Sequence, residues 1–441
     1  MKQQKKFKQT EIGKIPEDWE VKTFEETDIE IIDGDRGINY PKQEEFKNKG
    51  YCLFLSTKNT PNYKFDFSDS VFVTKERDDL LRKGKLVRGD IILTTRGTVG
   101  NVALYDEKIP FENIRINSGM VVLRNNDNFD THFLYLLLRS SLVREQFLSF
   151  ATGSAQPQLP IRDINKIRLI LPSILEQHFI ASILSSLDAK IELNQKMNKT
   201  LETIGQSLFK HWFIEFEFPN EKGKPYKSSG GEMIDSELGE IPKVWNIKSI
   251  KDFGQVICGK TPSTIDKDNF GLDYPFITIP DMHGKAFIVK TERKLSKVGV
   301  DTQKKKELPP LSVCVSCIAT TGLVSLTTEP SYTNQQINSI ICNKNISPYF
   351  MYLQMKNKEE EINIGGLGGT ATLNLNTGNF EKIKLINPEQ EVMKKFNGLV
   401  ENIFQKILEN SKEIESLMQI RDSLLPQLMS GKIRVPLEAK K

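Results

Sequence analysis

The sequence predicts an α+β fold built from a duplicated unit, in which each copy of a sheet-rich unit is followed by one long helix. Three observations predict it. Two segments of the first half recur in the second half, the residues between them alternate at the period of a β-strand, and a heptad pattern follows each copy. The duplication predicts an internal pseudo-two-fold repeat.

The repeat is visible near both ends of each copy. The opening segment 12–22, IGKIPEDWEVK, returns at 238–248 as LGEIPKVWNIK, and the closing segment 164–172, INKIRLILP, returns at 380–388 as FEKIKLINP. The chain has 441 residues, about three times the commonest domain size, so several compact units are expected.

Short strands are predicted inside each copy. Residues 87–104 and 311–326 alternate apolar with small or polar side chains and are interrupted by glycine. Apolar runs at 133–138 and 350–355 predict a short helix in each copy. The predicted units span 1–172 and 236–386, with a linker at 217–235 and a tail at 432–441.

A long helix is predicted after each unit, over 173–216 and over 387–431. Ser173 with Glu176 has the pattern of a capping box, and Pro388 stands where a first helical residue is expected. The apolar positions step by three and four residues, as in a heptad seam. The residues predicted to pair the helices are Leu184, Leu187, Ile191, Asn194 and Leu201 in the first helix and Val400, Ile403, Ile407, Asn410 and Leu417 in the second.

Each of these helices needs a partner, because a single apolar stripe about 60 Å long cannot remain in water. The other copy is the nearest available partner. Asn194 and Asn410 fall at equivalent seam positions, where a polar side chain fixes the register. The alternative is a pair of ordinary amphipathic helices, each packed on its own unit.

The composition excludes several classes of protein. Sixty-one Lys and Arg residues against 57 Asp and Glu give a net charge of +4, too small for coating nucleic acid by bulk charge but compatible with local basic surfaces. No apolar run approaches the roughly 20 residues of a membrane span, and the N-terminus has no secretory signal. Five scattered cysteines suit a reducing interior, so a cytoplasmic protein is expected.

Catalytic motifs are weak. Cys314 and Cys317 form one Cys-x-x-Cys in an apolar run without a second pair. Asp281, Glu292 and Lys294 follow the order of a magnesium-dependent nuclease, and such an enzyme remains an alternative function. Neither a glycine-rich nucleotide loop nor an adenine methyltransferase motif is present. The sequence therefore predicts no catalytic residue, no metal site and no bound cofactor.

Polar and basic side chains on glycine-punctuated turns recur in both halves. Arg, Lys, Asn and Gln are the residue types that read base edges, and Thr and Lys suit phosphate contacts. The predicted DNA-binding residues are Arg36, Lys58, Arg96 and Arg115 in the first half and Lys260, Thr261, Asn334 and Gln335 in the second.

Four segments carry a resemblance to a known family. They are 13–19, 239–245, GDRGINYP at 34–41 and LLPQLMSGKIRV at 424–435. With them the chain resembles the DNA specificity subunit of type I restriction-modification systems over essentially its whole length. The resemblance implies two mixed α/β target recognition domains, each reading half of a split asymmetric site in double-stranded DNA. It also implies that the two long helices form an antiparallel coiled coil between them.

The resemblance also implies partners. Two modification subunits would methylate adenine with S-adenosylmethionine, and restriction subunits would translocate and cut DNA with ATP and magnesium, so none of these cofactors should bind this chain. A structural coiled-coil scaffold without sequence preference is a third possible function. No recognition code can be transferred, because base contacts vary within the family.

Overall fold

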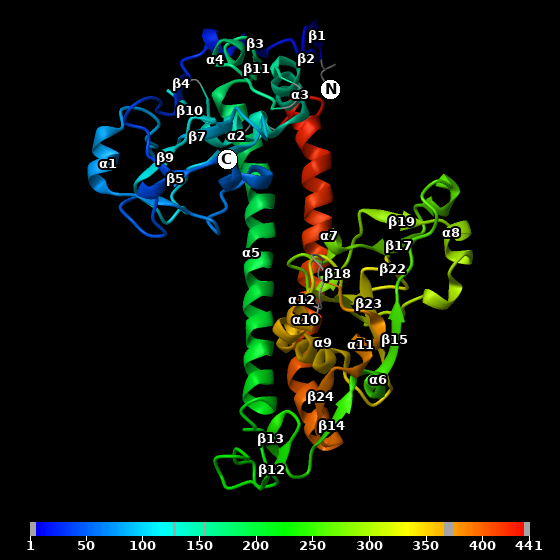
Figure 1. The fold of residues 1–441 in the computed structure, drawn as a ribbon. Coiled ribbons are helices and arrows are strands. Elements are labelled where there is room, and N and C mark those ends of the chain that lie inside the picture. The colour runs from blue at the N-terminus through cyan, green and yellow to red at the C-terminus, as the bar shows by residue number, and fades with distance from the viewer. Residues whose placement is uncertain (1–5, 127–128, 154–155, 366–373, 436–441) are drawn as a thin grey trace, which may run out of the picture. The chain divides into compact units, whose positions relative to one another are not determined.

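The computed structural model describes residues 6–126, 129–153, 156–365 and 374–435. The chain divides into two compact units: unit 1 comprises Met1–Ala189 and Met418–Lys441, and unit 2 comprises Lys190–Leu417. Both units combine sheets with helices, as the coloured ribbon in Figure 1 shows. The predicted α+β class is confirmed.

The main sheet of unit 1 has the order β4-β10-β7-β8 and is antiparallel throughout. A second sheet has the order β6-β5-β9, and two pairs, β1-β2 and β3-β11, stand apart. The bounds are β1 Phe7–Thr10, β2 Gly13–Pro16, β3 Glu20–Thr23, β4 Glu30–Asp33, β5 Cys52–Leu55, β6 Phe72–Val73, β7 Ile91–Thr94, β8 Val102–Leu104, β9 Ile114–Ile116, β10 Met120–Arg124 and β11 Arg168–Leu171.

Both faces of the main sheet are buried. On β7, Ile91 and Leu93 face one apolar core, and Ile92 faces another that it shares with β5 and β9. This double burial explains why β7 is a continuous apolar run. The helices of unit 1 before the long one are α1 Lys75–Leu80, α2 Thr131–Arg139, α3 Ser141–Phe150 and α4 Ile161–Ile164.

Unit 2 repeats this plan. Its sheets have the orders β15-β23-β20-β21-β18 and β16-β19-β17-β22, with the pairs β12-β13 and β14-β24. The strands are β12 Met233–Ser236, β13 Gly239–Pro242, β14 Asn246–Ser249, β15 Gly254–Cys258, β16 Phe270–Gly271, β17 Tyr274–Ile277, β18 Phe287–Ile288, β19 Arg293–Leu295, β20 Val313–Ser316, β21 Val324–Thr327, β22 Tyr332–Thr333, β23 Ile337–Cys342 and β24 Lys384–Asn387. The helices before the long one are α6 Ile250–Phe253, α7 Ile279–Met282, α8 Lys297–Asp301, α9 Pro348–Asn357, α10 Glu359–Gly365 and α11 Thr377–Lys382.

The internal repeat extends to the strand pairings. The pair β4-β10 in unit 1 corresponds to β15-β23 in unit 2, and the parallel pair β5-β9 corresponds to β17-β22. The pair β3-β11, which joins the two ends of the first copy, corresponds to β14-β24. The repeated sequence segments therefore mark the strands that begin and close each copy.

The two long helices are α5, Ile174–Phe213, and α12, Gln390–Met429. The sequence predicts them over 173–216 and 387–431. Within unit 2 they run antiparallel, since Asn194 contacts Glu413 and Asn198 contacts Asn410. None of the helices in the described ranges is long and apolar enough to span a lipid bilayer. Residues 436–441 of the predicted tail lie outside the described residues.

Candidate nucleic-acid interface

In unit 1 the loop after β4 is held against the start of β10. A Cβ atom at Gly34 would lie 2.2 Å from the Asn117 carbonyl oxygen, so only glycine fits this crossing. The next residue, Asp35, is buried, and its carboxylate accepts hydrogen bonds from the backbone amides of Arg36 at 2.8 Å and Arg82 at 2.5 Å. Burial by itself would raise the pKa of Asp35, but these amides hold the pKa below its ordinary value. The base of the loop, at Gly34 and Asp35, is therefore held in place, and the residues that follow it are exposed to solvent.

Three of the predicted DNA-binding residues converge around Gly119. Arg36 Nη2 lies 3.5 Å from the carbonyl oxygen of Ser118. A Cβ atom at Gly119 would lie 3.7 Å from Arg96 Cβ and 3.2 Å from Cγ2 of Thr57, the neighbour of exposed Lys58. The structure therefore brings Arg36, Lys58 and Arg96 to the same edge of the sheets.

The side chains of this group have unused hydrogen-bonding capacity. The Arg36 guanidinium is half exposed and forms an ion pair of 3.0 Å with Asp33. Arg96 is half-buried, and its Nε atom is buried without a hydrogen-bond partner. A donor in this position is energetically costly unless a ligand or water satisfies it.

Arg115 does not belong to this group. Its side chain is 7% exposed, and it forms an ion pair with Asp78, whose side chain is 1% exposed. Its guanidinium also donates to the carbonyl oxygens of Lys83 at 2.8 Å and Leu81 at 2.9 Å. The donors of Arg115 are therefore occupied by the segment 78–83. Arg115 stabilises this segment and is not available to bind a DNA base.

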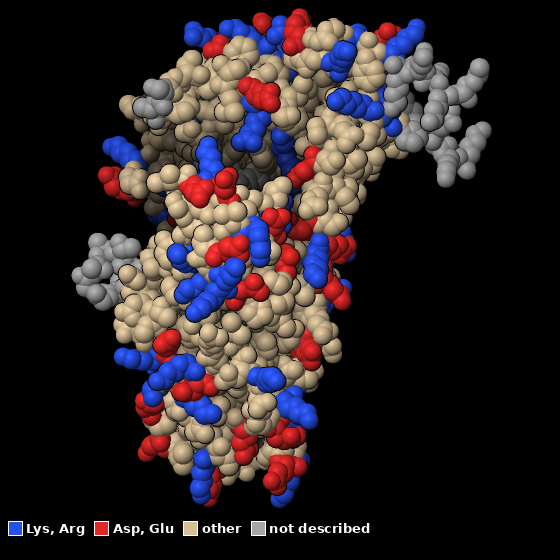
Figure 2. Space-filling view, turned by 90° about the vertical axis from the view of Figure 1, so that its right-hand side faces the viewer, with Lys and Arg blue, Asp and Glu red and all other residues tan. Residues whose placement is uncertain are grey.

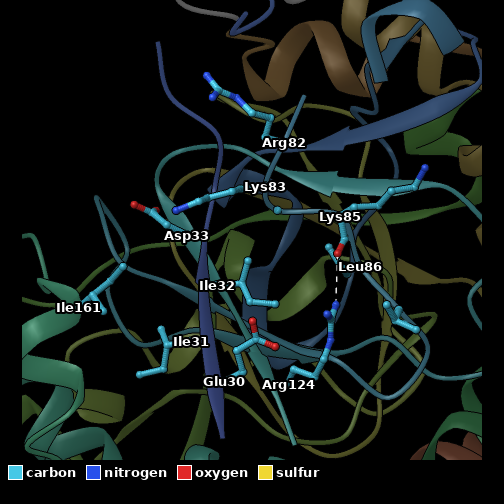
Figure 3. Close-up of a pocket in the computed structure, with 12 residues that line it drawn as sticks. Glu30, Ile31, Ile32, Asp33, Arg82, Lys83, Lys85, Leu86, Arg124 and Ile161 are labelled. Atoms are coloured by element: carbon cyan, nitrogen blue, oxygen red, sulfur yellow. Dashed lines mark hydrogen bonds between the residues drawn. The ribbon is translucent and has the colours of Figure 1, made fainter. Parts of the chain in front are cut away.

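An open cavity of about 750 Å³ lies beside this loop (Figure 3). Its charged lining is Arg82, Lys83, Lys85, Arg124, Glu30 and Asp33. Two of these cations are already paired, because Arg124 lies 2.8 Å from Asp90 and Lys85 lies 2.6 Å from Asp78. Figure 3 shows Lys83 pointing toward Asp33 and Arg82 pointing away from the cavity. The cavity offers positive charge to an anion but no catalytic constellation.

The equivalent loop of unit 2 repeats the crossing. A Cβ atom at Gly259 would lie 2.1 Å from the carbonyl oxygen of Asn334. This close approach corresponds to that of Gly34 to the Asn117 carbonyl oxygen in unit 1. The next amide, that of Lys260, donates to the carbonyl oxygen of Thr333 at 3.0 Å. Each unit therefore uses a glycine and an asparagine to hold its first loop against the strand that pairs with it.

All four residues predicted to bind DNA in unit 2 lie together. Thr261 Oγ1 donates to Gln335 Oε1 at 2.6 Å, which joins the loop after β15 to the turn before β23. Lys260 and Gln335 are exposed. Asn334 is 8% exposed, and its amide donates to Gln336 Oε1 at 2.9 Å, so it positions this turn.

The nuclease alternative has no support in the geometry. Asp281 is buried, and its Oδ2 accepts from the amide and hydroxyl of Thr278, each at 2.8 Å. Its Oδ1 accepts from the amide of Glu292 at 2.9 Å. Both carboxylate oxygens are therefore occupied by the chain itself. Among the described residues no group of three or more His, Cys, Asp and Glu side chains could hold a metal ion.

The Cys-x-x-Cys is buried in the core of unit 2. Both Cys314 and Cys317 are at most 1% exposed and are free thiols. Burial raises the pKa of Cys314 to about 12 and that of Cys317 to about 11. Neither thiol is a thiolate at neutral pH, so neither is a reactive nucleophile.

The residues predicted to pair the helices are all buried or half-buried. In unit 2 the contact centres on a polar layer. Asn194 Nδ2 donates to Glu413 Oε2 at 2.9 Å, and Asn410 Nδ2 donates to Asn198 Oδ1 at 2.9 Å. Polar side chains in an apolar seam favour one register, because any shift leaves them unpaired.

In unit 1 the two long helices share an ion cluster. Asp188 of α5 lies 2.8 Å from Arg421 of α12 and 3.0 Å from Arg139 of α2. Burial would raise the pKa of Asp188, but the two arginines lower it. The sequence did not indicate this cluster, because the three residues are far apart in the chain.

Positive charge is local and not widespread. On the face drawn in Figure 2, Lys and Arg side chains are interspersed with Asp and Glu over the described residues. This agrees with the net charge of +4. Any affinity for DNA must therefore come from specific contacts more than from a large basic surface.

Comparisons with known proteins give a consistent result. A family model described as the type I restriction modification DNA specificity domain matches residues 16–203 and 242–416. The HindI specificity subunit of Haemophilus influenzae is 35% identical, covering 91% of this chain and 98% of the relative. The MjaIX specificity subunit of Methanocaldococcus jannaschii is 28% identical, covering 97% and 96%.

A solved structure shares the fold. The crystal structure of a type I restriction-modification S subunit from M. genitalium superposes with a TM-score of 0.57 at 16% sequence identity. The match covers 93% of this chain and 96% of that one.

Proposed function

The chain belongs to the family of type I restriction-modification DNA specificity subunits, and on this premise we propose that each of its two units reads one half of a split DNA target. The chain is the recognition subunit of such a system and not its catalytic subunit. The family model matches one segment in each copy, 16–203 and 242–416, and we place one target recognition domain in each copy.

One observation carries the proposal. In both units a glycine holds the loop after the first strand of the main sheet against an asparagine, and polar or basic side chains gather beside that crossing. The side chains themselves differ: the group in unit 1 is rich in arginine, and the group in unit 2 contains Lys, Thr and Gln. A common scaffold with different side chains is what reading two different half-sites requires.

The side chains suggest roles. In the first half-site, Arg36 and Arg96 would each donate two hydrogen bonds to a guanine, and Lys58 would contact phosphate. In the second, Gln335 would read adenine, Lys260 and Thr261 would contact base or phosphate, and Asn334 would position the turn. Arg115 has only a supporting role, since its donors are occupied.

The chain would act within a complex in the cytoplasm. Two modification subunits would bring adenine methyltransferase activity with S-adenosylmethionine, and restriction subunits would bring ATP-dependent translocation and cleavage. The long helices α5 and α12 would set the distance between the half-sites. Their antiparallel pairing in unit 2 through Asn194 and Asn410 supports this role.

The experiment is to map methylated adenines genome-wide in cells that express a modification subunit with and without this chain. We expect a split, asymmetric motif that depends on the chain. Arg96→Ala should relax preference in one half of this motif, and Lys260→Ala should weaken recognition of the other half. Lys395→Ala, which alters an exposed helical residue, is the control.

Methylation without a motif would support a scaffold. Cleavage or methylation by the purified chain alone would contradict the recognition role.

A further inference from the structure

Two apolar side chains stand out by their exposure. Ile38 is 95% exposed and Ile265 is 94% exposed, which makes them the most exposed large apolar residues in the described part of the chain. Single exposed apolar residues are common on protein surfaces, so exposure alone implies nothing. The positions of these two residues are what carry the inference.

Both isoleucines lie on the same loop of the repeat. Ile38 follows Gly34 in the loop after β4, and Ile265 follows Gly259 in the loop after β15. These two glycines make the equivalent crossings described above. The two units therefore present an isoleucine from the same edge, although their loop sequences differ.

Each loop is braced next to its isoleucine. In unit 1 the Asn39 side chain donates to the Leu80 carbonyl oxygen at 3.4 Å, and Arg77 donates to the Asn39 carbonyl oxygen at 3.3 Å. In unit 2 the buried Asn269 donates to the Ser263 carbonyl oxygen at 3.0 Å. Neither loop collapses to bury its isoleucine, so each side chain is held in solvent at a fixed place.

The neighbours of both isoleucines are the polar residues assigned to DNA. Arg36 lies two positions before Ile38, and Lys260 and Thr261 lie on the same loop as Ile265. DNA offers apolar surface in two forms, the 5-methyl group of thymine in the major groove and the face of a base at an opened step. The charged phosphates offer no such apolar surface.

We propose that Ile38 and Ile265 make apolar contacts with DNA bases, one in each half-site. This inference rests on the proposed function, because it assigns additional specificity residues to the same two surfaces. Burial of an isoleucine that is fully exposed in the free protein contributes only when DNA is bound, so its removal should weaken binding and leave folding unchanged.

The test uses the chain assembled with its modification subunit and compares Ile38→Ala and Ile265→Ala with wild type. Loss of the buried side-chain carbons should lower affinity for a duplex carrying the mapped motif by about tenfold. Preference should change in one half-site for Ile38→Ala and in the other half-site for Ile265→Ala. Leu148→Ala and Val298→Ala, which alter residues 54% and 53% exposed on α3 and α8, should change neither.

Modified duplexes identify the contact. If the partner is a thymine methyl group, uracil at one position should weaken wild-type binding and leave the alanine variant unaffected. If the partner is an opened base step, 2-aminopurine placed there should brighten with wild type and not with the variant. Either result supports the inference.

Three results would overturn it. Unchanged affinity and motif in both isoleucine variants would reject the inference and leave the recognition function intact. Loss of subunit assembly with an unchanged motif would assign the isoleucines to a protein contact. A wild-type complex that methylates DNA without any motif would reject the recognition function itself.

Discussion

Trp19 in unit 1 and Trp245 in unit 2 are the same residue of the repeat, yet different chemistry holds them. Trp19 is fully buried, and its Nε1 donates to Glu176 Oε2 at 2.9 Å. Trp245 is 3% exposed, and its Nε1 is buried without a hydrogen-bond partner. Trp19 contacts a residue that follows α12, and Trp245 contacts a residue that follows α5. The two copies therefore attach the end of a long helix by different interactions.

In unit 1 the closure is an ion cluster. Arg434, just beyond α12, forms ion pairs with Glu176 at 2.6 Å and Asp18 at 2.7 Å, and it lies over the Trp19 ring at 5.7 Å. The Glu176 side chain is only 1% exposed. A Cβ atom at Gly431, whose φ is +66°, would lie 2.3 Å from Pro16, so the turn into this cluster requires glycine.

In unit 2 the closure is a cluster of aromatic rings. Trp245 stacks on Phe218 at 4.7 Å and contacts Phe213 at 5.6 Å and Phe216 at 5.7 Å. The residue that corresponds to Glu176 is Val392, which is buried. In unit 2 the end of the long helix is thus held to the sheet domain by apolar burial, and the stability of such a contact depends little on pH or salt.

The largest expected effect comes from breaking the ion cluster. Arg434→Met leaves the Glu176 carboxylate buried without its partner, which should destabilise unit 1 by about 3 kcal/mol. Hydrogen exchange should show faster opening of β3 and β11, with little change in β14 and β24. Lys243→Met is the matched control, because it removes an ion pair near Trp245 whose partners are 60% and 71% exposed.

A double substitution sharpens this prediction. Glu176→Val combined with Arg434→Met copies the valine of unit 2 and removes both charges. Most of the lost stability should return, since the penalty lies in the unpaired carboxylate. If the double variant is no more stable than Arg434→Met, burial of an unpaired charge is not the cause.

The next effect compares the two tryptophans. Trp19→Phe and Trp245→Phe remove similar volume, but only Trp19→Phe removes a hydrogen bond and leaves a buried acceptor. Trp19→Phe should therefore cost about 1 to 2 kcal/mol more than Trp245→Phe. Denaturant unfolding of both variants measures the difference. Equal losses would mean that the Trp19–Glu176 hydrogen bond contributes no net stability.

The smallest effect is a pH dependence of the ion cluster in unit 1. The hydrogen bonds from Arg434 lower the pKa of Asp18 below its usual 3.8. A lowered pKa in the folded state gives stabilisation that is present above about pH 4 and lost as the pH falls through the folded-state pKa. Asp18 is 62% exposed, so the loss should stay below about 1 kcal/mol.

Asp18→Asn provides the control for the pH effect. Thermal unfolding between pH 6 and pH 3 should show a smaller decrease of stability in Asp18→Asn than in wild type. Unit 2 has Val244 at the corresponding position and should not share this dependence. The same decrease in both proteins would assign the acid sensitivity to other carboxylates.

The fold was predictable because its signals are local or periodic. The repeated segments that contain Trp19 and Trp245 mark strands that begin each copy, and the segments 164–172 and 380–388 mark the strands that close it. The heptads mark α5 and α12. A pattern of three- and four-residue steps depends only on neighbouring turns of one helix. The family resemblance of the sequence is confirmed by the comparisons.

The candidate site was only partly predictable, because side-chain partners come from distant parts of the chain. Arg115 looked like a base contact, but Asp78, which lies 37 residues away, holds it in the interior. Arg434 and Glu176 are separated by 258 residues. The exposure of Ile38 has the same origin, since an isoleucine in a sequence is expected to be buried until the fold shows otherwise.

The central claim is that each unit reads one half-site and that α5 and α12 set the distance between them. The most direct test inserts seven residues after Asn198 in α5 and seven after Glu409 in α12, which lie opposite each other because Asn198 contacts Asn410. One heptad preserves the seam and lengthens each helix by about 10.5 Å, roughly three base pairs of DNA. Mapping of methylated adenines should show both half-sites unchanged and a spacer about three base pairs longer. A fully active complex with an unaltered spacer, or with altered half-sites, would contradict the claim.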